Sequence, residues 1–153
     1  MSGRVYDIFI SYSREDKWLA ADICHSLRQA GLTVAFDEDC LGNGDDLGLS
    51  VLNIIESAKC VLFLCTPNSV QSNWVKNEIN YCVGIGKRVV PVNLDRTELP
   101  VDLMSLLGAL NVIPLNTDNL ESDIAWLVNL VRGFQKLIYC IHIMHTIRQK
   151  AFA

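Results

Sequence analysis

The sequence has no cluster of basic residues and little excess charge of either sign. Its 13 lysines and arginines stand against 17 aspartates and glutamates, which gives a formal net charge of -4 at pH 7. Proteins that bind a phosphate backbone or an acidic membrane surface carry a basic patch. We therefore expect no nucleic-acid partner.

Long hydrophobic runs are also missing. The N-terminus has no basic stretch followed by an apolar run, so we expect no signal peptide. The most apolar segment near the end, residues 137–147, has about half of the roughly 20 residues that a membrane-spanning helix needs. We expect a cytoplasmic protein without a membrane span.

The six cysteines lack the paired spacing of metal-binding motifs. Several lie inside apolar runs, which is typical of reduced cysteines in the core of a cytosolic protein. The sequence therefore predicts no metal site.

What is present is an alternation of short apolar runs and segments of helical spacing. The runs are rich in β-branched residues and lie at residues 5–11, 32–36, 60–66, 88–92 and 109–114. Because they are nearly continuous rather than alternating, they are typical of strands buried on both faces of a parallel sheet.

Helical spacing occurs between these runs, at residues 18–30, 47–58, from about 69, at 101–107 and from about 119. Gly31 stands where a helix commonly ends. The alternation predicts an α/β, flavodoxin-like three-layer fold with a five-stranded parallel sheet in the order 2-1-3-4-5. We expect this domain at residues 1–133, and at 134–153 an apolar C-terminal helix or a junction to a partner module.

A ligand site is expected between strands one and three, where the strand order of such a sheet reverses. Residues 11–16 and 66–69 follow these two strands, and Glu78 lies two turns into the next helix with Trp74 one turn earlier on the same face. Each has a plainer alternative. Asp16 could cap the first helix, Asn68, Ser69 or Ser72 could cap the third, and Trp74 could simply pack.

The segment from Asp7 to Asp16, DIFISYSRED, resembles the first signature box of the Toll/interleukin receptor (TIR) domain family. The resemblance continues through residues 31–37, the glycines Gly42 and Gly44, the run 61–66, the segment SNWVKNE at 72–78, and VVPV at 89–92. It covers roughly residues 4–133 and implies the TIR fold.

Many bacterial, plant and axonal TIR domains cleave NAD+, and these carry a glutamate four residues after a tryptophan on the third helix. The resemblance therefore implies Glu78 as the catalytic residue of an NAD+-cleaving, prokaryotic-type domain. It also implies that the substrate is bound by Phe9, Tyr12, Ser13, Arg14, Asp37 and Trp74. NAD+ is then the substrate, and neither a metal nor a further cofactor is demanded.

The loop at residues 37–46 is unusually acidic, with five carboxylates, and in the family this loop takes part in assembly. The residues expected in TIR–TIR contacts are Asp39, Leu41, Gly42, Gly44 and Asp45. Such a loop would repel an anionic dinucleotide unless it moved, which predicts that assembly activates the domain.

Two functions stay open. The leading one is an NAD+ nucleosidase that gives nicotinamide and ADP-ribose or a cyclic isomer, activated by oligomerisation in antiphage or innate immune defence, with a fused or separate sensor module as partner. The alternative is a noncatalytic TIR interaction module, either a signalling adaptor or a pathogen mimic of host adaptors. A response regulator is disfavoured, because Thr66 and Pro67 stand where its phosphate-receiving aspartate would be.

Overall fold

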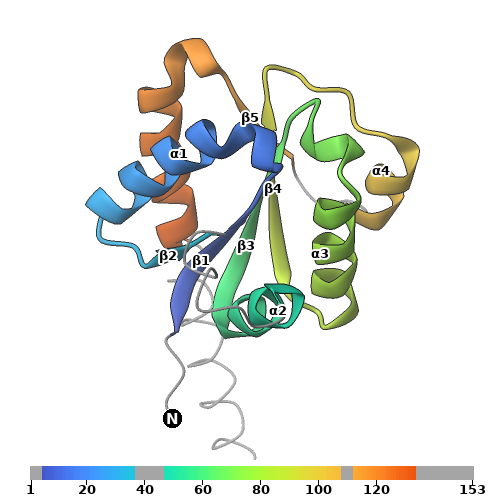
Figure 1. Cartoon of the computed structure of the whole chain (residues 1–153). Coiled ribbons are helices and arrows are strands. Elements are labelled where there is room, and N and C mark those ends of the chain that lie inside the picture. The colour runs from blue at the N-terminus through green and yellow to red at the C-terminus, as the bar shows by residue number, and fades with distance from the viewer. Residues whose placement is uncertain (1–4, 37–46, 108–111, 134–153) are drawn as a thin grey trace, which may run out of the picture.

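A five-stranded parallel sheet lies between two layers of helices in the computed structural model, which describes residues 5–36, 47–107 and 112–133 (Figure 1). The strands are β1 (Tyr6–Ser11), β2 (Val34–Ala35), β3 (Ala58–Cys65), β4 (Arg88–Leu94) and β5 (Ile113–Leu115). Their order is β2-β1-β3-β4-β5, and all four neighbouring pairs are parallel. The predicted fold class is confirmed.

The helices divide between the two faces of the sheet. One face is covered by α1 (Lys17–Gln29) and a helix at residues 120–133; the other is covered by α2 (Leu47–Ser57), α3 (Asn73–Gly84) and α4 (Val101–Leu107) (Figure 1). Short 3-10 turns precede α1, α3 and the last helix, at η1 (Arg14–Asp16), η3 (Ser69–Gln71) and η4 (Thr117–Asn119).

Two separate cores result, because successive side chains of a strand point to opposite faces. In β1, Ile8 and Ile10 pack under α1 and the helix at 120–133, whereas Phe9 packs under α2 and α3. Ser11 is the next residue in the Phe9 series, so the alternation directs its side chain toward α2 and α3.

Gly31 ends α1 as the sequence predicts. It adopts a φ of +90°, which glycine tolerates far better than other residues. Its N–H bonds the Arg28 carbonyl at 3.0 Å, and the Leu32 N–H bonds the Leu27 carbonyl at 3.2 Å. This is the Schellman arrangement, and it turns the chain directly into β2.

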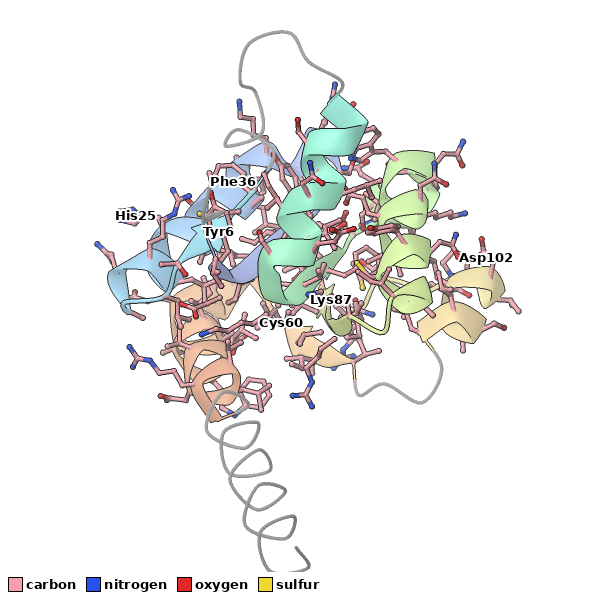
Figure 2. All side chains as sticks on the ribbon, turned by 90° about the horizontal axis from the view of Figure 1, so that it is seen from below. Tyr6, His25, Phe36, Cys60, Lys87 and Asp102 are labelled. Atoms are coloured by element: carbon pink, nitrogen blue, oxygen red, sulfur yellow. The ribbon has the colours of Figure 1, made fainter. Side chains whose placement is uncertain are left out.

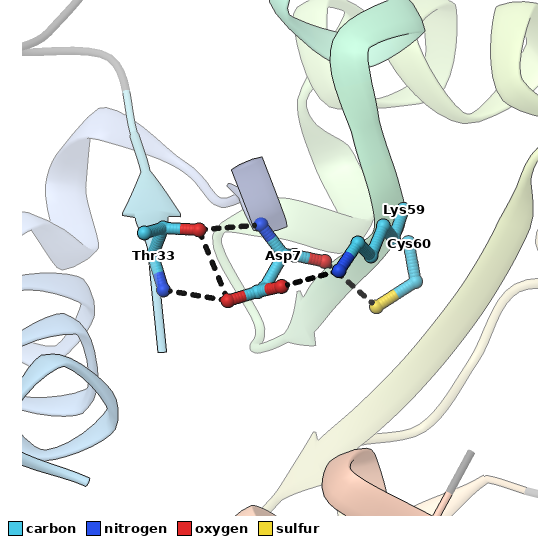
Figure 3. A network of polar contacts seen from close by, with 4 residues as sticks. All are labelled: Asp7, Thr33, Lys59 and Cys60. Atoms are coloured by element: carbon cyan, nitrogen blue, oxygen red, sulfur yellow. Dashed lines mark hydrogen bonds and ion pairs between the residues drawn. The ribbon is translucent and has the colours of Figure 1, made fainter. Parts of the chain in front are cut away.

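Asp7 joins β1 to the start of both neighbouring strands (Figure 3). Its carboxylate accepts hydrogen bonds from the Thr33 N–H at 2.8 Å and from the Thr33 hydroxyl at 3.0 Å, and it pairs with Lys59 Nζ at 3.0 Å. Burial raises the pKa of Asp7, but the Thr33 and Lys59 contacts outweigh this, so the pKa lies below its ordinary value.

Lys87 ties the end of α2 to the amino end of β3. Its ammonium donates to the carbonyls of Glu56 and Ala58, at 3.1 and 2.7 Å. Figure 2 labels Lys87 beside the end of α2. Near it, the Tyr81 hydroxyl donates to the Glu56 carboxylate and so links α3 to α2. These contacts hold the two helices that flank the site described below.

Some boundaries differ from the prediction. The sequence predicts the second strand at residues 32–36, but β2 spans only Val34–Ala35. The Leu32 N–H bonds the Leu27 carbonyl at the end of α1 and is not available to the sheet. Expected at 109–114, β5 lies at Ile113–Leu115, and residues 108–111 are outside the described ranges. The division at residue 133 stays a prediction, because residues 134–153 are not described either. Within the described ranges, no helix is long and apolar enough to cross a membrane.

Candidate active site

A cavity of about 300 Å³ lies between α2 and α3, and Glu78 forms part of its wall. Its other lining residues are Val51 and Leu52 from α2, and Trp74, Asn77 and Tyr81 from α3. Trp74, Glu78 and Tyr81 recur at intervals of three to four residues, so one face of α3 supplies them. The prediction that Trp74 and Glu78 share a face is confirmed.

Glu78 is buried, with 4% of its surface exposed. The Ser11 hydroxyl donates to its Oε2 at 2.5 Å. A buried carboxylate is costly unless it is hydrogen-bonded, and bonds to a charged acceptor are among the strongest. Burial and the Glu78 charge together raise the pKa of the nearby Cys82 thiol to about 12.

The start of α3 is fixed by several hydrogen bonds. Ser72 caps the helix, as predicted among the alternatives, by accepting the Val75 N–H at 3.3 Å. One turn earlier, the Ser69 hydroxyl donates to the Leu64 carbonyl at 2.6 Å and accepts the Thr66 N–H at 2.8 Å. The backbone that carries Trp74 and Glu78 is therefore anchored to the end of β3.

The crevice expected between β1 and β3 is bridged by Asp16. Its carboxylate accepts the Thr66 hydroxyl at 2.5 Å and the Asn68 amide at 3.0 Å. Asp16 stands at the N-cap position of α1, as the alternative reading placed it, but its side chain makes no capping hydrogen bond to that helix. The polar groups at this point bond one another, and the cavity lined by Glu78 lies between α2 and α3.

Four further predicted substrate-binding residues lie within the described ranges but do not line this cavity. Phe9 is fully buried in the core under α2 and α3, and Tyr12 packs against Phe36 in the opposite core, with ring centroids 6.0 Å apart. Ser13 is buried ahead of η1, and Arg14 is exposed. None of these four lines the cavity, and their substrate roles stay predictions.

Asp37 and the loop residues Asp39, Leu41, Gly42, Gly44 and Asp45 lie outside the described ranges. Their roles in substrate binding and assembly therefore stay predictions.

Sequence reasoning placed Ser11 at the crevice but did not pair it with Glu78. It did not assign Val51, Leu52 or Asn77 to the site. The alternation of β1 could have placed Ser11 on the Glu78 side of the sheet, because it follows Phe9 by two residues. The α2 residues carry no such signal. Their place opposite Trp74 depends on how two helices pack, which sequence spacing does not specify.

A second cavity, of about 1060 Å³, lies at the carboxyl ends of β4 and β5. Asn93, Asp95, Arg96 and Asn116 are among its lining residues, and it shares no residue with the Glu78 cavity. It is larger, yet it lacks a buried carboxylate among its lining residues. We therefore place the candidate active site at Glu78.

The parallel sheet of this order, with Trp74 and the buried Glu78 one turn apart on α3, agrees with the TIR-like class of α/β domain that the sequence resemblance implies. The sequence profile of the TIR domain matches residues 8–128, and the chain belongs to the TIR domain family. The resemblance seen in the sequence is thereby confirmed.

Two curated relatives come from prokaryotes. The 2′ cyclic ADP-D-ribose synthase of Bacteroides thetaiotaomicron is 34% identical over 76 residues, which cover 49% of this chain and 26% of that protein. The NAD(+) hydrolase of a Theionarchaea archaeon is 28% identical over 89 residues, which cover 56% of this chain and 27% of that protein. The chain spans 22–33% of the length of the curated relatives it matches.

Solved structures agree on the fold. The metazoan TIR-STING receptor of C. gigas matches with a TM-score of 0.65 and 30% identity, over 80% of this chain and 39% of that chain. The TIR domain of a Toll-related receptor of Hydra magnipapillata matches with a TM-score of 0.68, over 84% of this chain and 99% of that chain. Because the identity of this second match is only 18%, it supports the fold alone.

Proposed function

We propose that this chain is a TIR-domain NAD+ nucleosidase, which cleaves the bond between nicotinamide and ribose. The observation that carries the proposal is Glu78, a buried carboxylate held at 2.5 Å by Ser11 on the wall of a cavity that it shares with Trp74. The names of the two prokaryotic relatives, a cyclic ADP-D-ribose synthase and an NAD(+) hydrolase, support the same reaction class.

The chemistry needs one well-placed carboxylate. The bond from ribose C1′ to the nicotinamide nitrogen breaks with both electrons going to nitrogen, so neutral nicotinamide leaves without being protonated. An oxocarbenium-like ribose with positive charge remains. Glu78 accepts hydrogen bonds from the ribose hydroxyls and stabilises this charge, as one carboxylate of a glycosidase does.

Two nucleophiles compete for the ribose cation. Addition of water to C1′ with loss of a proton gives ADP-ribose, whereas attack by the adenine or a ribose hydroxyl of the same molecule gives a cyclic isomer. The reaction needs NAD+ as substrate and no further cofactor. Arg14, exposed after β1, is placed by resemblance at the phosphates, and Trp74 at the nicotinamide end.

The cavity is small for a dinucleotide. Its volume of about 300 Å³ lies at the lower end of the range of roughly 300–1,000 Å³ for ligand pockets. We propose that the nicotinamide-ribose half enters it, and that the rest of NAD+ is held by surfaces completed on self-association of the domain. Activation by oligomerisation in a cytoplasmic immune or antiphage system, under a fused or separate sensor, is part of this proposal.

The test is to incubate the protein with NAD+ at a series of protein concentrations and to resolve the products by liquid chromatography. Nicotinamide release should rise more steeply than in proportion to protein concentration. Glu78→Gln should lower turnover by about a hundredfold or more, as loss of a group that stabilises transition-state charge does. Glu121→Gln, an exposed carboxylate on the opposite layer, is the matched control.

Unchanged turnover in Glu78→Gln would refute the catalytic role. If the folded wild-type protein releases no nicotinamide at any concentration and yet self-associates, the noncatalytic interaction module replaces the enzyme.

A further inference from the structure

Ser11 and Glu78 are 67 residues apart in sequence and meet between the sheet and α3. Ser11 is the last residue of β1, is 1% exposed, and pairs in register with Phe63 of β3. Its hydroxyl is thus carried by a strand in the interior of the sheet, between β2 and β3.

Glu78 is carried differently. Its backbone is fixed because α3 is capped at Ser72 and anchored through Ser69, but three rotatable bonds separate the carboxylate from that backbone. The hydrogen bond from Ser11 to Oε2 acts at the far end of the side chain. It fixes the direction of the carboxylate relative to the cavity before any ligand arrives.

We propose that Ser11 is a positioning residue for the reaction, which holds the Glu78 carboxylate in the orientation that faces the ribose. The inference rests on the proposed function. Ser11 does not line the cavity, so it acts through Glu78 and not on the substrate. Removing it should therefore lower kcat and leave KM for NAD+ nearly unchanged, because the binding surfaces stay in place.

The experiment measures kcat and KM for nicotinamide release in Ser11→Ala, Ser11→Cys and Ser11→Thr. A misplacement of about 1 Å costs around a hundredfold in rate, so we expect kcat of Ser11→Ala to fall by about tenfold to a hundredfold. Ser11→Thr keeps the hydroxyl and should restore most of kcat, whereas Ser11→Cys offers a weak donor and should fall between. Ser57→Ala, which loses a hydroxyl that donates to the Ile54 carbonyl, is the matched control.

A second measurement does not depend on turnover. Thermal unfolding of Ser11→Ala, Glu78→Ala and the double variant forms a double-mutant cycle, in which each single variant removes one partner of the hydrogen bond. We expect the melting temperature of the double variant to fall by less than the sum of the two single losses, because the two side chains share one interaction. Additive losses would overturn the inferred coupling even if a Ser11 variant were too unstable to assay.

The outcomes separate the two proposals. If the wild-type protein turns over NAD+ and Ser11→Ala has the same kcat, the role of Ser11 is overturned and the proposed nucleosidase activity is unaffected. A rise in KM at constant kcat also overturns it, since it would place Ser11 in substrate binding. Absence of turnover in the wild-type protein at all concentrations overturns the proposed function and this inference with it.

Discussion

The Asp16 carboxylate and the Thr66 hydroxyl meet at 2.5 Å and join the carboxyl ends of β1 and β3. Both side chains are buried, with 8% and 4% of their surfaces exposed. The contact closes the point where the strand order reverses, and through Thr66 it connects η1 to the turn that leads into α3.

Replacing Asp16 by alanine should destabilise the fold. The buried Thr66 hydroxyl and the Asn68 amide would lose their acceptor, so we expect the free energy of unfolding to fall by about 1–3 kcal/mol. Urea denaturation measures this, with Glu15→Ala, its exposed neighbour, as the control. Equal stability of the two variants would mean that the contact contributes nothing.

Trp74→Phe should leave stability unchanged or raise it by up to about 1 kcal/mol. Within the described residues the indole Nε1 is buried without a hydrogen-bond partner, and an unsatisfied buried donor is costly. Phenylalanine keeps an aromatic ring in the cavity wall and removes that donor. Denaturant unfolding tests this; a loss above about 2 kcal/mol would show that packing of the larger ring decides the outcome.

Arg14→Ala should weaken NAD+ binding without affecting the fold. If the guanidinium contacts a phosphate, loss of this charge-assisted bond should raise KM by about tenfold or more. Because Arg14 is exposed, the melting temperature should not change. Lys17→Ala, also exposed and close in sequence, controls for loss of one positive charge, and an equal KM in the two variants would argue against a specific contact.

Asp7→Asn should lower the free energy of unfolding at neutral pH by about 1 kcal/mol. This figure is kept small because solvent screens the partly exposed pair of Asp7 with Lys59. The Thr33 and Lys59 contacts depress the pKa of the folded Asp7 carboxyl below its usual 3.8. This stabilisation is therefore present above about pH 4 and is lost as the pH falls through the lower folded pKa.

Urea unfolding of Asp7→Asn and wild type from pH 7 to pH 2 should show curves that converge in acid. Asp102→Asn breaks a comparable but exposed pair with Lys76 and should have no measurable effect at any pH. A difference in the free energy of unfolding between wild type and Asp7→Asn that stays constant with pH would contradict the prediction.

Alkaline pH should destabilise the fold through its buried thiols. Burial raises the pKa of Cys60 to about 11 and of Cys65 and Cys82 to about 12, from an ordinary value near 9.0. Above pH 9 the folded chain holds protons that the unfolded chain releases, so the free energy of unfolding falls as the pH rises toward 12. At pH 10 each thiol should contribute a loss of about 1 kcal/mol.

The measurement is urea unfolding at pH 8, 9 and 10 for wild type and Cys65→Ala. At pH 8 the free energy of unfolding of Cys65→Ala should be lower than that of wild type, because the substitution leaves a small cavity. Between pH 8 and pH 10 it should fall by less than that of wild type. Parallel curves would exclude Cys65 as a source of the pH dependence.

The fold could be predicted because its signals are local. Continuous β-branched runs, the helical spacing of α1 and the glycine at position 31 each depend on neighbours in sequence. The shared face of Trp74 and Glu78 followed in the same way from their four-residue spacing.

What could not be predicted depends on distant partners. Asp16 has the residue type and position of a helix cap, and only the fold brings Thr66 within its reach, 50 residues away. From sequence, Ser11 belongs to the residues that follow the first strand at the crevice. Its actual partner is Glu78, and this pairing depends on which face of the sheet α3 covers. Leu32 belongs to an apolar run, yet its N–H is used by the end of α1, which shortened β2.

The chain has 3 tryptophans, and the fold distributes them unequally. Trp18 and Trp126 are 62% and 52% exposed on the α1 layer, whereas Trp74 forms part of the wall beside Glu78. With the two exposed indoles replaced by phenylalanine, the emission of the remaining one would report on the cavity alone. The protein thus carries its own fluorophore at the place where a ligand would quench it.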